Sequence, residues 1–132
     1  HPIDDVVPVV SSADWIACQE VVRKIHLDDQ IRTYILEIVH GTRDNENILL
    51  GGSPRASLSL QRAAQASAAI QGRTFVVPDD VKKLVAPVLS HRIILKPETR
   101  LRKIKTEDVI KDVLDDIPVP VSSDYHTEKD YF

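Results

Sequence analysis

Residues 53–72 read SPRASLSLQRAAQASAAIQG. This stretch predicts a long helix, because its many alanines have high helix propensity and allow a neighbouring backbone to approach closely. Ser53 suits the N-cap, and Pro54 then falls at the first helical position, where its missing N–H removes no helical hydrogen bond. Gly72 is expected to end the helix. The face expected to point inward holds Ala56, Leu60, Ala63, Ala64 and Ile70.

Two helices are expected before this stretch. Ser11 and Asp14 have the spacing of a capping box, and the apolar residues after them predict a helix that reaches about His26. Asp28 caps the next helix, and Gly41 is expected to end it by adopting the left-handed conformation. The inward residues are Trp15, Cys18, Val22 and Ile25, with Val21 beside them, in the first helix, and Ile31, Tyr34, Ile35, Ile38 and Val39 in the second.

Two more helices are expected after it. Pro78 begins the first, and Pro87 falls inside its apolar stripe, which predicts a kink or a helix end near Ala86. Thr106 is expected to cap the last helix, which Pro118 stops. The inward residues are Val81, Leu84, Val85, Val88 and Leu89 in the first, and Val109, Ile110, Val113, Leu114 and Ile117 in the second.

The connecting segments complete the predicted fold. Residues 92–95 are β-prone and could pair with residues 74–76, while residues 96–105 read as a basic loop. The fold class is therefore mainly α, a small bundle of about five helices with at most a minor two-strand β element. One domain is expected over residues 1–121, followed by a polar and mobile tail at residues 122–132.

Composition limits the classes of function. The chain has 132 residues, 42% of them hydrophobic, and a net charge of −3, so it lacks the basic excess that is typical of a domain gripping phosphates of nucleic acid. Its single cysteine, Cys18, excludes an internal disulfide, and no apolar run approaches the roughly 20 residues that cross a bilayer. We therefore expect a cytoplasmic protein without membrane contact. The absence of methionine indicates that His1 is not a translation start and that the chain is an excised fragment.

The stretch with the clearest chemical pattern joins a polar loop, residues 42–50, to the central helix. Gly51 and Gly52 allow a sharp turn and a close approach to a ligand, and the helix start that follows directs N–H groups and a positive partial charge outward. Arg55 lies in the first turn, where a cation is mildly unfavourable unless an anion is nearby. These residues fit a phosphate sensor, but they also fit an ordinary loop and cap.

Other polar residues fit structural roles better than chemical ones. His26, His40 and His91 share no helix face with one another, so we expect no metal site. Two of the four adjacent acid pairs lie where helix caps are expected, so capping fits them better than acid–base chemistry. Arg62 faces the same way as Arg55 and could support a subunit contact or be solvated. Arg43 and Arg73 could face another domain or complement the negative end of a helix.

A resemblance to one family covers about residues 2–121. The residues that carry it are Gly51, Ser53, Pro54, Arg55 and Ala56, then Gly72, Arg73, Val76, Pro78, Asp80 and Val81, and the pair His91-Arg92. The segment PVVSSADW, the pair Thr42-Arg43 and the closing residues 117–120 fit it as well. In order and spacing these resemble the helical lid of MoxR-type AAA+ ATPases.

This resemblance implies that the chain is a lid that closes over ATP, bound with magnesium mainly by a core domain that is absent here. By position, Arg55 would be the sensor-2 arginine that reaches the γ-phosphate, with Gly51, Ser53 and Pro54 forming the rest of the nucleotide-binding turn. The family acts in chaperone-like remodelling of protein complexes, assembles into rings, commonly hexamers, and often has von Willebrand factor A-type partners.

The sequence departs from the whole ATPase in one respect. It contains no G-x-x-x-x-G-K stretch followed by Ser or Thr, and no apolar strand that ends in Asp-Glu. We therefore expect no ATP hydrolysis and no tight nucleotide binding by this chain alone. The rival hypotheses are a helical nucleic-acid-binding module and a protein-interaction bundle with no link to nucleotide.

Overall fold

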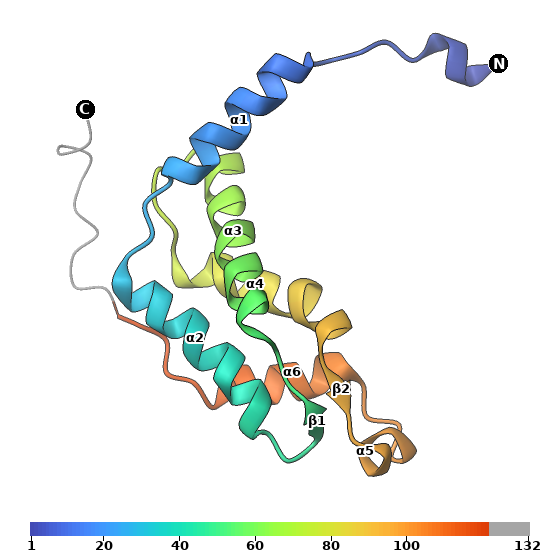
Figure 1. The fold of residues 1–132 in the computed structure, drawn as a ribbon, viewed down its shortest axis with the longest axis vertical. Coiled ribbons are helices and arrows are strands. Elements are labelled where there is room, and N and C mark those ends of the chain that lie inside the picture. The colour runs from blue at the N-terminus through green and yellow to red at the C-terminus, as the bar shows by residue number, and fades with distance from the viewer. Residues whose placement is uncertain (122–132) are drawn as a thin grey trace.

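The computed structural model describes residues 1–121, and the polar tail expected at residues 122–132 lies outside them. The described chain is a helical bundle with one small antiparallel sheet, which confirms the predicted fold class (Figure 1). Its elements are η1 (Pro2–Asp5), α1 (Ser12–Lys24), α2 (Asp29–Asp44), β1 (Ile48–Leu50), α3 (Pro54–Ile70), α4 (Pro78–Leu89), η2 (Ser90–Arg92), β2 (Ile94–Leu95), α5 (Pro97–Leu101) and α6 (Thr106–Asp115).

The core lies between α2, α3, α4 and α6. The helix α3 packs against α1, α2 and α4, and α6 packs against α2 and α4. The predicted stripe of α2 is buried throughout, and small residues on α3 allow its neighbours to approach. The core residues on these four helices are Ile31, Tyr34, Ile35, Ile38, Val39, Ala56, Leu60, Ala64, Ala68, Val81, Val85, Leu89, Val109, Ile110 and Val113.

The helix starts largely follow the sequence. The Ser11 hydroxyl accepts from the Asp14 N–H at 3.1 Å, and the Asp14 carboxylate accepts from the Ser11 N–H at 3.0 Å, which confirms the capping box. Asp28 caps α2 by accepting from the Gln30 N–H at 2.8 Å. The prediction that Thr106 caps the last helix was wrong by one residue, because Thr106 is already the first helical residue.

Gly41 does not end α2 as expected. The helix continues to Asp44, and Gly41 faces α6 instead. A Cβ at Gly41 would lie 3.0 Å from Val113 Cγ1 and 3.3 Å from Ile117 Cδ1. The glycine therefore permits close packing of α6, which the sequence pattern could not distinguish from a helix cap.

Pro87 does not end α4. The helix runs past Ala86 to Leu89, with Pro87 inside its last turn. The missing N–H removes one helical hydrogen bond, but Val85 and Leu89 on either side are fully buried. Burial of these side chains holds the last turn in place.

The predicted strand pairing was wrong. β2 pairs with β1, through Ile48 with Leu95 and Leu50 with Ile94, so the segment expected as a polar loop contains a strand. Phe75 instead forms an isolated parallel bridge with His26. Burial of Ile48 and Leu95 determines that β2 pairs with β1, and the local β-propensity of the sequence does not indicate this partner.

Three further expectations need correction. Residues 96–105 are not all loop, since they contain α5. Ile70 is 87% exposed, and Gln65 takes a buried place on α3, where its side-chain N–H donates to the Ile25 carbonyl at 2.8 Å. No residue within α1 is buried, although Trp15 and its stripe were expected inside. The reason is that α1 extends beyond the bundle (Figure 1).

Candidate functional site

The central helix α3 begins with neither an acidic residue nor a side-chain cap in its first turn. Ser53 has extended backbone angles and is the N-cap, with Pro54 at the first helical position, as predicted. The Ser53 side chain makes no capping hydrogen bond, and the first turn of α3 contains no acidic residue. The N-terminal end of α3 therefore keeps its positive partial charge available to an anion.

Arg55 lies in this first turn with an exposed side chain. Within residues 1–121, no hydrogen bond or ion pair holds its guanidinium. All of α3, from Pro54 to Ile70, lacks Asp and Glu, and Arg62 is exposed on the same face seven residues on. This face can receive an anion, and Arg55 can present a planar pair of donors to it.

The turn before α3 is tied to the end of α2 by two hydrogen bonds. The Gly52 N–H donates to the Thr42 hydroxyl at 2.8 Å, and Arg43 Nε donates to the Gly52 carbonyl at 2.7 Å. Thr42 is fully buried, and its hydroxyl donates to the Val39 carbonyl at 2.6 Å. Both backbone groups of Gly52 are thus bonded, which fixes where α3 begins.

This arrangement gives Thr42 and Arg43 a role that sequence analysis missed. Arg43 was expected to face another domain or to complement a helix end, but it bonds to the turn that carries Arg55. Thr42 was noted only as part of a family pattern. The available signal was a polar pair at a helix end followed at a short distance by two glycines.

Gly51 contacts α2 so closely that a side chain has no room. A Cβ there would lie 2.7 Å from the Thr42 carbonyl oxygen and 2.8 Å from the Arg43 Cα. Gly52 is less tight, with its nearest contact at 3.1 Å to Val39 Cγ1. The glycines were expected to bring the backbone close to a ligand, whereas the structure shows a close approach to α2.

Exposed leucines flank Arg55. Leu50, directly before the turn, is 58% exposed, and Leu58, one helical turn after Arg55, is 55% exposed. Apolar side chains beside an unpaired cation are typical of a surface that another protein covers. The surface at the start of α3 is called the Arg55 surface below, and it comprises Leu50, Gly51, Ser53, Arg55 and Leu58.

The other end of α3 is held by a buried ion pair. Arg73 donates from Nη1 and Nη2 to the two carboxylate oxygens of Asp80, each at 2.7 Å. The Asp80 carboxylate also accepts from the Val77 N–H at 3.0 Å and the Ser67 hydroxyl at 3.2 Å, and its side chain is only 2% exposed. Arg73, expected to face another domain or a helix end, therefore joins α3 to α4.

The electrostatics of Asp80 follow from these contacts. Burial raises the pKa of the Asp80 carboxyl, but the hydrogen bonds from Arg73 and from the Val77 N–H more than offset this, so the net pKa lies below its ordinary value. Asp80 is thus an ionised residue that caps α4 and closes an internal ion pair, as the capping prediction for the acid pairs requires.

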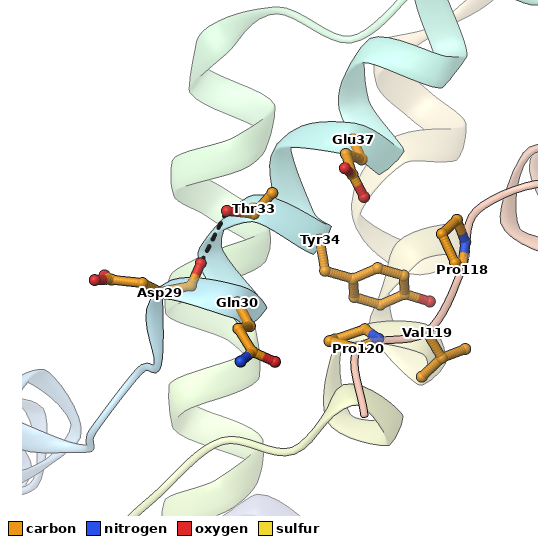
Figure 2. Close-up of a pocket in the computed structure, with 8 residues that line it drawn as sticks. All are labelled: Asp29, Gln30, Thr33, Tyr34, Glu37, Pro118, Val119 and Pro120. Carbon is orange, nitrogen blue, oxygen red and sulfur yellow. Dashed lines mark hydrogen bonds between the residues drawn. The ribbon is translucent and has the colours of Figure 1, made fainter. Parts of the chain in front are cut away.

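A separate groove lies between α2 and residues 118–120 (Figure 2). Its volume is about 370 Å³, and Asp29 and Glu37 contribute carboxylates to its lining. The ring of Tyr34 lies against this segment, and the Tyr34 hydroxyl is buried without a hydrogen-bond partner among residues 1–121. Burial, and then the negative charge of Asp79, raise the pKa of Tyr34. The groove shares no residue with the Arg55 surface.

Replacing Tyr34 by phenylalanine should leave the stability unchanged or raise it by up to about 1 kcal/mol, because the hydroxyl is desolvated without a hydrogen bond. Thr42→Val is the matched control, since the Thr42 hydroxyl makes two hydrogen bonds and its loss should cost about 1–3 kcal/mol. Urea unfolding monitored by circular dichroism measures both. A loss above about 1 kcal/mol in Tyr34→Phe would contradict the prediction.

Two further observations concern metal sites and membrane spans. In the described residues, no group of three or more His, Cys, Asp or Glu side chains could hold a metal ion. None of the helices within residues 1–121 combines the length and hydropathy needed to cross a membrane. His91, one of the three histidines considered as ligands, lies exposed and accepts from Arg92 Nε at 3.2 Å.

Known proteins resemble this chain in sequence and structure. A model of the AAA lid domain matches residues 40–113. YeaC of Bacillus subtilis is 40% identical over 121 residues, which are 92% of this chain and 38% of YeaC. The chaperone MoxR1 of Mycobacterium tuberculosis is 31% identical over 121 residues, which are 85% of this chain and 32% of MoxR1.

A solved structure agrees with these matches. The crystal structure of a candidate ATPase from Cytophaga hutchinsonii superimposes with a TM-score of 0.80 at 30% identity, over 85% of this chain and 37% of that protein. The chain thus spans about a third to two fifths of the length of its relatives. The match from residue 40 to residue 113 includes the Arg55 surface and the Arg73–Asp80 pair.

Proposed function

Since this chain belongs to the AAA lid domain family, as the lid of a MoxR-type ATPase, we propose that it senses nucleotide through Arg55. In this proposal a core domain binds ATP and magnesium, and Arg55 reaches the γ-phosphate when the lid closes. The observation that carries it is the exposed, unpaired guanidinium at the open start of α3.

The electrostatics of α3 support an anionic ligand. The helix end contributes a positive partial charge, Arg55 adds a full charge, and no carboxylate on α3 opposes either. A triphosphate would offset the unfavourable contact between the cation and the helix dipole. Arg55 would then stabilise the negative charge that develops on the phosphoryl group in the transition state.

The attachment of the turn supports a role in positioning. Arg55 follows Gly52 by three residues, and Gly52 is bonded to both Thr42 and Arg43. The guanidinium is thus mounted on a turn that moves together with α2. Movement of the lid as a body would bring Arg55 to the nucleotide or withdraw it.

The exposed leucines support a protein partner at the same surface. Leu50 and Leu58 would be covered by the core domain when the lid closes over ATP. In the complete ATPase we propose a hexameric ring that remodels other proteins together with von Willebrand factor A-type partners. The chaperone role in this proposal agrees with the name of the relative MoxR1, a chaperone. ATP hydrolysis would reside in the core domain.

The test is Arg55→Ala in the ATPase that contains this lid together with its core. The rate of phosphate release should fall about 100- to 1,000-fold, because one donor to the developing charge is lost. The lid should stay folded, since the exposed Arg55 side chain makes no hydrogen bond or ion pair within residues 1–121.

Arg62→Ala is the matched control, because Arg62 is exposed on the same face but farther from the helix start. Its rate should stay within about twofold of the wild type. Wild-type turnover in Arg55→Ala, with circular dichroism unchanged, would reject the assignment of Arg55 as the sensor.

A further inference from the structure

Residues 96–105, which include α5, concentrate positive charge in an acidic chain. They hold five Lys and Arg residues and one Glu, a net charge of +4, while the whole chain carries −3. Four of the five cations are exposed, and none forms an ion pair within residues 1–121. Like charges gathered in this way repel one another, and an anionic partner would relieve the repulsion. This segment is called the basic lobe below, and its cations are Lys96, Arg100, Arg102, Lys103 and Lys105.

The tip of the basic lobe presents an apolar side chain. Leu101 is the last residue of α5 and is 83% exposed. It lies between Arg100 and Arg102, and Lys103 follows with a φ of 60°. This left-handed conformation is costly for a residue other than glycine, and such backbone is found preferentially at binding sites. The exposed leucine and the cations around it are therefore the part of the lobe that suits a partner.

A surface with the complementary properties lies at the other end of α6. The groove between α2 and residues 118–120 has a largely apolar lining, to which Glu37 adds a carboxylate (Figure 2). The Tyr34 hydroxyl, which has no hydrogen-bond partner among residues 1–121, belongs to the same lining. Asp115 and Asp116 end α6 just before this segment, and the last turn of α6 holds no basic residue. Carboxylates at this end oppose the helix dipole, so a cation beside them would be favourable.

We propose that the basic lobe docks on this groove of a second copy of the chain. Leu101 would lie against residues 118–120 of the partner subunit, with the cations of the lobe near the carboxylates around the groove. The lobe cannot reach its own groove, because α6 separates them and its 10 residues span about 15 Å (Figure 1). The proposal uses no residue of the Arg55 surface, so it holds whether or not Arg55 senses nucleotide.

The charges favour a second copy over nucleic acid as the partner. Outside the basic lobe the chain carries −7, the difference between −3 and +4, and this charge would repel a long polyanion. The lobe also contains no Phe, Trp or Tyr on which a base could stack. A second copy offers carboxylates for the cations and an apolar groove for Leu101, so both features of the lobe are matched.

The contact joins different surfaces of the two copies. Each copy in a pair keeps one free surface, so the contact can repeat from copy to copy, in a ring if the rotation closes. It is small and depends on exposed charges, so it should be weak and sensitive to salt. This sensitivity and the pairing of two different surfaces make the proposal testable.

The first test is sedimentation equilibrium of the 132-residue chain from about 10 µM to about 1 mM, in about 20 mM and about 500 mM salt. At low salt the mean mass of the wild type should rise above that of the monomer as the concentration increases. High salt should raise the dissociation constant at least about tenfold. Leu101→Ser, which leaves the net charge unchanged, should raise it at least about fivefold.

Charge reversal tests the pairing of the two surfaces. The lobe variant is Arg102→Glu with Lys103→Glu, and the groove variant is Glu37→Lys with Asp115→Lys. Each variant alone should stay monomeric at low salt, because like charges then face each other. An equimolar mixture should associate, because the reversed charges are again opposite.

Arg23→Glu with Lys24→Glu is the matched control. It changes the net charge by the same amount as the lobe variant, but its residues are exposed on α1, away from both surfaces (Figure 1). It should associate like the wild type, and circular dichroism should show all variants folded.

Several results would overturn the proposal. A wild-type monomer at every concentration in low salt would do so, and binding of that monomer to duplex DNA through the lobe would favour the nucleic-acid hypothesis instead. Association that survives in the lobe variant, or that is lost equally in the α1 control, would contradict the docking of the lobe. A mixture of lobe and groove variants that stays monomeric would show that these two surfaces do not meet.

Discussion

Replacing Asp80 by asparagine is expected to lower the free energy of unfolding by about 3 kcal/mol at pH 7. The carboxylate is almost fully buried, and its loss leaves Arg73 with an unpaired charge in a largely buried position. Arg73 retains 24% exposure of its side chain, so water relieves part of the cost and the effect falls at the low end of the range for broken internal pairs. Urea unfolding of both proteins measures the difference.

The pH dependence of stability provides a second test of the Asp80→Asn prediction. The pKa of Asp80 is lower in the folded chain than in the unfolded chain, where it lies near 3.8. The ionised carboxylate therefore stabilises the fold above about pH 4, and this contribution is lost as the pH falls through the folded pKa. The difference in stability between wild type and Asp80→Asn should shrink in acid for this reason.

Asp79→Asn is the control, because Asp79 is the exposed neighbour in the same helix turn. Its only expected loss is the interaction with the helix dipole, about 0.3–1 kcal/mol. An Asp80→Asn protein as stable as Asp79→Asn at pH 7, or a gap between wild type and Asp80→Asn that does not narrow in acid, would show that the ion pair does not stabilise the fold.

Gly51→Ala should also be severe, with a loss of about 2–4 kcal/mol. The added Cβ would meet the Thr42 carbonyl oxygen at 2.7 Å, and this neighbour is backbone that cannot rotate away. The turn would have to move from α2, which strains or breaks the two hydrogen bonds of Gly52. In the complete ATPase the same change should lower turnover, because Arg55 is displaced with the turn.

Ser53→Ala is the control that distinguishes the close contact of Gly51 with α2 from a general sensitivity of the turn to substitution. Ser53 lies two residues on, but its side chain makes no capping hydrogen bond, so its replacement should change stability by less than about 0.5 kcal/mol. If Gly51→Ala unfolds at the same urea concentration as Ser53→Ala, the close approach to α2 does not constrain the turn.

The sequence predicted elements better than it predicted their partners. The start of α3 at Ser53 and the burial of the α2 stripe follow from local periodicity and capping chemistry, and both are confirmed. The pairing of β2 with β1 could not be read in this way, because it depends on which residues become buried together. Gly41 shows the same limit. In a sequence, a glycine that allows a neighbouring helix to pack closely cannot be distinguished from a glycine that ends its own helix.

The helix start that carries Arg55 was predictable from the sequence, whereas the hydrogen bonds that hold the preceding turn were not. Arg55 was identified from one helix start and a family resemblance, and the structure places it on an exposed turn. The hydrogen bonds of Thr42 and Arg43 to Gly52 span about ten residues of chain, so no periodicity within a single element reports them. The prediction that Trp15 is buried was wrong for a different reason. Its apolar stripe is regular, but the stripe extends beyond the helix that would cover it.

Hydrogen bonds at both ends of α3 make this helix a rigid connection between its neighbours. One end is fastened through Gly52 to α2, and the other is joined through Ser67 and Arg73 to Asp80 of α4. A helix of 17 residues is about 25 Å long and resists bending. A small tilt at the Arg55 end of α3 therefore displaces the opposite end of the helix, which α1 contacts (Figure 1).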